Sequence, residues 1–168
     1  MSEVATKKID SITKPVKDWM RVSKEDSKLS KSYMIVSFLA LLVGGFLGLA
    51  QGMNRAGLFE LPSWFNYYQT LTSHGILLVL IFTTTFVVGY LYAGMSYTLG
   101  GLLPKVRKMG WIAFWTKIAG AVIAIIPVIM GEASVMYTFY PPMAAHPMFY
   151  FGLVLLVVGI WINAFGAF

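Results

Sequence analysis

After residue 31 the chain is almost free of charge, and this constrains its fold more than any other feature. Of its 20 Lys, Arg, Asp and Glu residues, 13 lie in residues 1–31 and seven are spread over the following 137. Long apolar runs of this kind are typical of membrane helices, which need about 20 residues to cross a bilayer. The 137 residues therefore have room for four spans and for no soluble catalytic domain. The absence of cysteine excludes disulfides and thiolate metal sites.

The apolar segments predict an all-α membrane protein with four transmembrane helices. We expect a charged cytoplasmic tail over residues 1–31 and a transmembrane portion over residues 32–168. The expected spans cover about residues 33–53, 70–99, 111–130 and 148–168. Because the second span is longer than a bilayer requires, we expect a tilted or irregular segment at its end. Pro104 is expected to interrupt the helix in the connection before the third span.

The distribution of Lys and Arg predicts a cytoplasmic amino terminus. Eight of these residues precede the first span, one follows it, three follow the second span and none follows the third. No charged residue follows the fourth span, which runs to Phe168. This ending favours a longer polytopic protein of which the chain is a truncated part. The alternative is a short natural terminus at the membrane interface.

His74, about four residues inside the second span near its outer end, is the main candidate for chemistry. Ionisable side chains at membrane depth are costly and often mark ligand, proton or ion sites. A neutral imidazole is a natural axial ligand of haem iron. The alternative is an interfacial histidine that hydrogen-bonds to Thr72, Ser73 or a neighbouring helix.

Three other ionisable residues receive simpler interpretations. His146 is expected to be a loop histidine, although it could clamp a haem with His74 if the two came close. Glu132 is expected to be solvated, and Lys117 to snorkel its ammonium to the headgroups.

A stripe of small residues (Gly44, Gly48 and Gly52) predicts close helix packing. The cluster Thr83, Thr84 and Thr85 is expected to bond to carbonyls of its own helix.

Two motifs carry a family resemblance. YYQTLTSHG (67–75) opens the second span and EASVMYTFYPP (132–142) precedes the fourth. In combination they resemble subunit I of the haem-copper terminal oxidases, especially the B-type cytochrome c oxidases. The resemblance covers nearly all of the chain after the tail and corresponds to the first four of the family's twelve or more core helices.

The resemblance implies that His74 is one of two axial ligands of a low-spin haem of b or a type. It assigns no ligand role to Tyr140 or His146. The second axial ligand, the high-spin haem and copper B would depend on later helices, so the chain alone is predicted to be inactive and to hold no catalytic residue. The segment between the second and third spans has no Asp or Asn, so the proton path of A-type oxidases is not expected.

The implied function is part of a respiratory enzyme of the prokaryotic plasma membrane that reduces oxygen to water with proton translocation. The implied partners are membrane lipid, the remaining helices of subunit I, a copper-containing subunit II, and cytochrome c or a similar electron donor, with no nucleic acid. One alternative is a subunit of the related quinol oxidases or nitric oxide reductases. Another is a small structural or assembly membrane protein without a cofactor.

Overall fold

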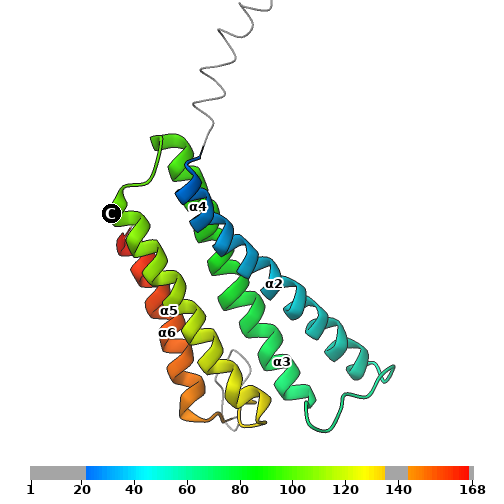
Figure 1. The fold of residues 1–168 in the computed structure, drawn as a ribbon. Helices are drawn as coiled ribbons and strands as arrows, with labels where there is room; N and C mark the ends of the chain where they lie inside the picture. The colour runs from blue at the N-terminus through cyan, green and yellow to red at the C-terminus, as the bar shows by residue number, and fades with distance from the viewer. Residues whose placement is uncertain (1–21, 135–143, 167–168) are drawn as a thin grey trace, which may run out of the picture.

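The computed structural model describes residues 22–134 and 144–166, which form a bundle of long helices (Figure 1). The first 21 residues of the predicted tail, residues 135–143 (which include most of the second motif) and the last two residues lie outside the described part. The helical segments, in chain order, are α2 (Lys24–Arg55), α3 (Tyr67–Gly75), η1 (Ile76–Phe82), α4 (Thr83–Leu99), α5 (Pro104–Ile129) and α6 (Pro147–Gly166). Since α3, η1 and α4 form one continuous helix, the described residues contain four helices long and apolar enough to cross a membrane. The predicted all-α membrane fold is confirmed.

All four spans begin earlier than predicted, and two of them by seven residues or more. Helix α2 begins at Lys24, inside the segment assigned to the tail, because the Ser23 hydroxyl caps it by accepting from the Asp26 amide at 3.2 Å. Helix α5 begins at Pro104, seven residues before the expected start. Proline is favoured in the first turn, where no amide donor is needed, so the interpretation of Pro104 as a breaker was wrong.

The second span has its irregularity in the middle, and the prediction of an irregular end was wrong. Its helix continues to Leu99 and is ended by Gly100, which adopts a left-handed φ of 74°. Residues Ile76–Phe82 instead form a π-helix, directly after Gly75. The three threonines that follow donate to carbonyls of their own helix, at Leu78, Leu80 and Ile81, as predicted.

The bundle consists of two antiparallel helix pairs (Figure 1). Helix α2 packs along α3, η1 and α4, whereas α5 packs along α6, with less extensive contact between the pairs. Small residues bring α5 and α6 together: a Cβ on Gly152 would lie 2.6 Å from the Ala124 nitrogen and 2.6 Å from the Gly120 carbonyl oxygen. Such close approach is typical of membrane helices, whose association depends on packing rather than on the hydrophobic effect.

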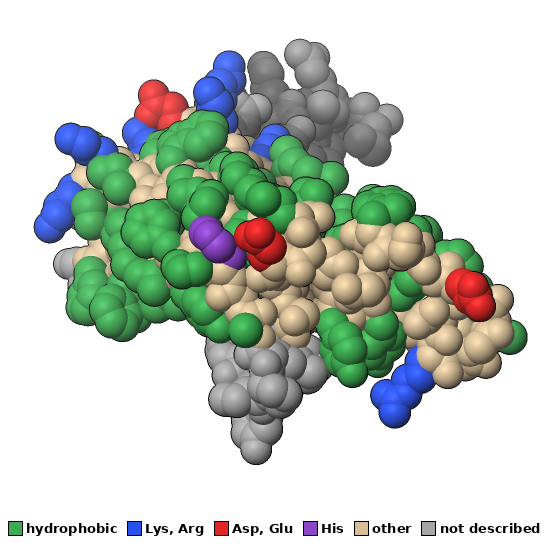
Figure 2. All heavy atoms as spheres, turned by 90° about the horizontal axis from the view of Figure 1, so that it is seen from below, with side chains coloured by type: hydrophobic (Ala, Val, Ile, Leu, Met, Phe, Trp, Pro, Cys, Tyr) green, Lys and Arg blue, Asp and Glu red, His purple; other side chains and the backbone are tan. Residues whose placement is uncertain are grey.

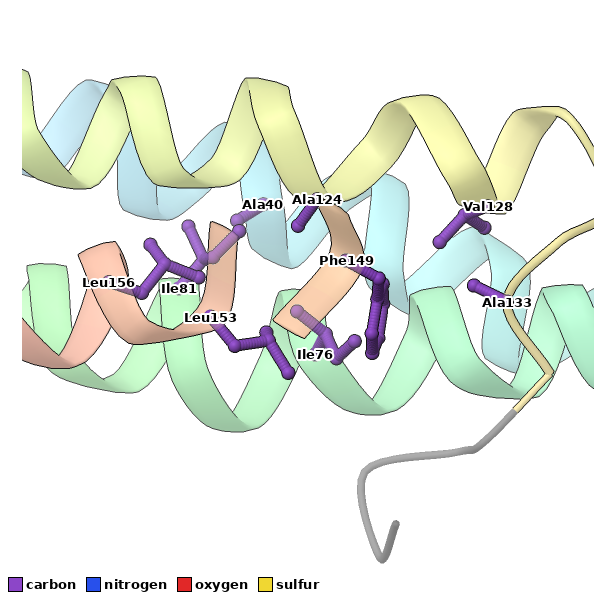
Figure 3. Close-up of a cluster of buried hydrophobic side chains, with 9 residues drawn as sticks. All are labelled: Ala40, Ile76, Ile81, Ala124, Val128, Ala133, Phe149, Leu153 and Leu156. Atoms are coloured by element: carbon purple, nitrogen blue, oxygen red, sulfur yellow. The ribbon is translucent and has the colours of Figure 1, made fainter. Parts of the chain in front are cut away.

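Two hydrophobic clusters join the pairs. Figure 3 shows the larger, which draws residues from all four spans: Ala40, Ile76, Ile81, Ala124, Val128, Ala133, Phe149, Leu153 and Leu156. The second lies toward the end where α2 begins and comprises Leu29, Tyr33, Tyr92, Leu102, Val106 and Phe114. Beside the larger cluster, the Gln69 side-chain amide of α3 donates to the Val128 carbonyl of α5 at 2.7 Å.

Asp26 ties the start of α2 to the connection between α4 and α5. Its fully buried carboxylate accepts from the Ser96 hydroxyl at 2.7 Å, the Leu102 amide at 2.9 Å and the Arg107 Nε at 2.7 Å. Arg107 also pairs with Glu25. A buried carboxylate is stable only with such a complete set of partners. The sequence interpretation, which placed Asp26 in a solvated tail, missed this cluster.

Large hydrophobic side chains cover much of the outer surface. On α2 alone, the exposed members include Ile35, Phe38, Leu42, Phe46 and Leu49. Figure 2, seen from the end where α3 begins, shows hydrophobic side chains over much of that view, with Lys and Arg toward its edges. These faces are suited to contact with lipid chains or with further helices.

Candidate functional site

His74 lies in the last turn of α3, where its imidazole packs against α2. A capping box of Asn66 and Gln69 starts α3, and the π-helix follows the His74-Gly75 pair directly. The ring is partly buried, with Nδ1 2.7 Å from the Gly44 carbonyl oxygen. The structure therefore places this predicted residue at a helix interface, in contact with a neighbouring helix.

This contact determines which ring nitrogen can bind a metal. A carbonyl oxygen is only an acceptor, so Nδ1 must carry the proton and donate it to Gly44. In a neutral imidazole the lone pair then belongs to Nε2, which has no hydrogen-bond partner among the described residues. A backbone carbonyl that binds Nδ1–H is the usual arrangement for a histidine that ligates a metal through Nε2. The donor set fits one axial haem ligand.

Gly48 provides the space that the ring occupies. A Cβ at this position would lie 2.5 Å from His74 Cε1 and 2.6 Å from Nδ1, closer than non-bonded atoms approach. Gly44 packs in the same way against Leu77 and Leu78, whereas Gly52 has nothing within 4 Å. The predicted packing stripe thus holds for its first two members. The contact between Gly48 and the His74 imidazole was not predicted. The spacing of four residues between the glycines did indicate that another part of the protein would pack closely there.

The structure does not bring the second histidine to the first. His146 is exposed and precedes α6, where its Nδ1 accepts from the Met148 amide at 3.2 Å and its own amide donates to the Glu132 carbonyl at 2.8 Å. Its contacts are at the junction of α5 and α6, while those of His74 are with α2. Within residues 22–134 and 144–166, no three His, Asp or Glu side chains form a group that could hold a metal ion. The Glu132 side chain is exposed, as expected.

Lys117 does not snorkel, and that prediction was wrong. Its side chain is 2% exposed, and Nζ lies 5.5 Å from the centre of the Tyr33 ring. Because α5 begins at Pro104, Lys117 is 13 residues into the helix, about 20 Å from its start and beyond the reach of its stem. The polar residues Tyr92 and Asn163 are also buried and bond to each other, and nothing in their spacing along the chain predicted this contact.

The fold places the chain among the polytopic α-helical membrane proteins. Residues 28–168 match the family model described as Cytochrome C and Quinol oxidase polypeptide I. Cytochrome c oxidase subunit 1 of Thermus thermophilus is 34% identical over 149 residues, which cover 83% of this chain and 26% of that protein. The chain therefore belongs to the subunit I family of cytochrome c and quinol oxidases.

A solved structure shows the same fold. It is described as a cryo-EM structure of a heme-copper terminal oxidase dimer, and it matches with a TM-score of 0.77 and 37% sequence identity. The match covers 86% of this chain and 25% of the other. The chain thus spans about a quarter of the length of the relatives that it matches.

Proposed function

We propose that the chain forms the low-spin haem-binding part of a cytochrome c oxidase subunit I, with His74 as one axial ligand through Nε2. The observation that carries this proposal is the hydrogen bond from Nδ1 to the Gly44 carbonyl, 2.7 Å long, which leaves the Nε2 lone pair free. Membership of the subunit I family supplies the reason to expect haem at such a histidine.

In this proposal α2 and α3 together orient the ligand. Gly44 fixes the tautomer and the plane of the imidazole, and Gly48 allows the ring to lie against the backbone of α2. When bound, the haem supplies one-electron transfer, with a potential that depends on its axial ligands. The second axial ligand comes from another part of subunit I, because His146 has its contacts at the junction of α5 and α6, whereas His74 packs against α2.

The activity of the whole enzyme is also a proposal: reduction of oxygen to water coupled to proton translocation. The high-spin haem and copper B belong to the helices of subunit I that this chain does not supply, so the chain alone is inactive. A copper-containing subunit II and cytochrome c are the proposed partner and electron donor. The name of the Thermus relative supports cytochrome c over quinol, whereas the family description covers both.

The proposed location is the plasma membrane of a prokaryote, with a cytoplasmic amino terminus. The supporting observation is the distribution of charge, because α2 and α5 begin at the same end of the bundle (Figure 1). Exposed lysines gather in their first turns: Lys24, Lys28, Lys31, Lys105 and Lys108. Such an excess of positive charge is typical of the cytoplasmic side.

The test is His74→Ala in the assembled oxidase, examined by a reduced-minus-oxidised visible spectrum. We expect the low-spin haem band to be lost, because Nε2 is its ligand, while His146→Ala retains the band. Immunodetection of subunit I in the purified complex shows that both variants assemble. An unchanged low-spin band in His74→Ala would refute the proposal.

A further inference from the structure

A buried amine lies near the middle of the bundle, away from His74. Lys117 is 13 residues from the start of α5, a helix of 26 residues, and its side chain is 2% exposed. Its Nζ has no hydrogen-bond partner among the described residues, and both ion pairs found there belong to Arg107. An ionisable side chain at this depth that meets no carboxylate is costly to keep. A buried amine of this kind is therefore a candidate functional group.

The surrounding helices are shaped around this side chain. A Cβ on Gly159 of α6 would lie 2.5 Å from Lys117 Cγ, so the glycine leaves room for the stem. From α2, the Tyr33 ring lies with its centre 5.5 Å from Nζ, a position from which an aromatic face stabilises a cation. Gly89 of α4 in turn leaves room for Tyr33, since a Cβ there would lie 2.9 Å from Tyr33 Cβ.

Hydrogen bonds of two tyrosines converge on the Asn163 amide and fix the position of the Tyr33 ring. The Tyr33 hydroxyl lies 2.8 Å from the Gly110 carbonyl oxygen and 3.0 Å from Asn163 Oδ1, and the Tyr92 hydroxyl lies 2.9 Å from the same Oδ1. The Asn163 amide is held in place by donating to the Gly159 carbonyl at 3.1 Å. Each phenol has a single proton, so Tyr33 can direct its proton to either of two acceptors. Either bond holds the Tyr33 ring in place against α5 and α6.

We propose that Lys117 and Tyr33 form an internal proton-binding site. Lys117 Nζ takes up one proton from water, and the face of the Tyr33 ring stabilises the ammonium that forms. The proton returns to water when the amine becomes neutral again. Only N–H and O–H bonds form and break. The titratable group that faces the amine is Tyr33 from α2. No described carboxylate lies within ion-pair distance of Nζ. The site is independent of haem binding at His74.

The test is nitrogen-15 NMR of the chain in lipid bilayers, with its lysine side chains labelled, as the pH is varied. We expect one lysine signal to switch between neutral amine and ammonium separately from the others. This signal should be lost in both Lys117→Met and Lys117→Arg and should persist in Lys108→Met, whose side chain is exposed. A Lys117 signal that remains ammonium, or remains neutral, at every pH overturns the proposal.

A second variant tests the aromatic ring. Tyr33→Leu removes the face that stabilises the ammonium, so we expect the Lys117 signal to switch to neutral amine at a lower pH than in the unchanged chain. Tyr90→Leu, at an exposed tyrosine of α4, is the control and should leave the switch unchanged. Equal switching in the two variants overturns the role of Tyr33. Because no haem is involved, neither result depends on the function proposed for His74.

Discussion

At the scale of single residues, Gly48 determines how closely α2 approaches the His74 imidazole. In Gly48→Ala the new methyl would lie 2.5 Å from Cε1 and 2.6 Å from Nδ1, so the ring must turn or the helices must separate. We expect loss of the hydrogen bond to Gly44, a smaller low-spin haem band in the assembled oxidase, and a stability cost of about 1–3 kcal/mol.

The matched control is Gly52→Ala in the same helix, since nothing lies within 4 Å of that position. Thermal denaturation and the reduced-minus-oxidised spectrum measure the two effects. Equal behaviour of the two variants would show that Gly48 has no part in positioning the imidazole.

Residues differ in how far their roles could be predicted from the sequence. His74 could be identified because a histidine at membrane depth is rare and needs a partner. The contact with Gly48 could not be derived, because it depends on the register of α2 against α3. The burial of Lys117 was missed for a similar reason. Its stem packs against α6 at Gly159, which lies 42 residues later in the chain.

At the scale of helices, the pairing of α5 with α6 depends on glycine at position 152. Gly152→Ala would place a methyl 2.6 Å from the Gly120 carbonyl oxygen and 2.6 Å from the Ala124 nitrogen, both backbone atoms that cannot turn aside. We expect the two helices to separate and the thermal midpoint of the purified protein to fall, at a cost of about 1–3 kcal/mol. Gly94→Ala, where nothing lies within 4 Å, should leave the midpoint near that of the unchanged protein. A fall of equal size in both variants contradicts this account.

The existence of the helices could be predicted, but their ends and internal form could not. Length and hydropathy are sufficient to find four spans. Pro104 is compatible with either the end or the first turn of a helix, and Leu103 precedes it as the cap of α5. The π-helix at Ile76–Phe82 has no marker in its composition, because it consists only of apolar residues.

At the scale of the whole molecule, the bundle offers His74 as its one proposed haem ligand and presents large apolar faces to its surroundings. We therefore predict that the purified chain alone shows no sharp low-spin haem band. Coexpression with the remaining helices of an oxidase subunit I should produce the band, because a second axial ligand then becomes available. Reduced-minus-oxidised spectra of the two preparations make the comparison. A sharp low-spin band from the chain alone would mean that both ligands are already present, which the position of His146 contradicts.

The cover that α6 places over Lys117 has a consequence for biosynthesis. Helix α5 is synthesised first, and a lysine at the centre of a single helix costs about 3 kcal/mol to insert into a membrane. The cost falls once Gly159 and the aromatic face of Tyr33 surround the stem and the amine. Helices α5 and α6 are therefore expected to leave the translocation machinery together, as a hairpin that is already closed.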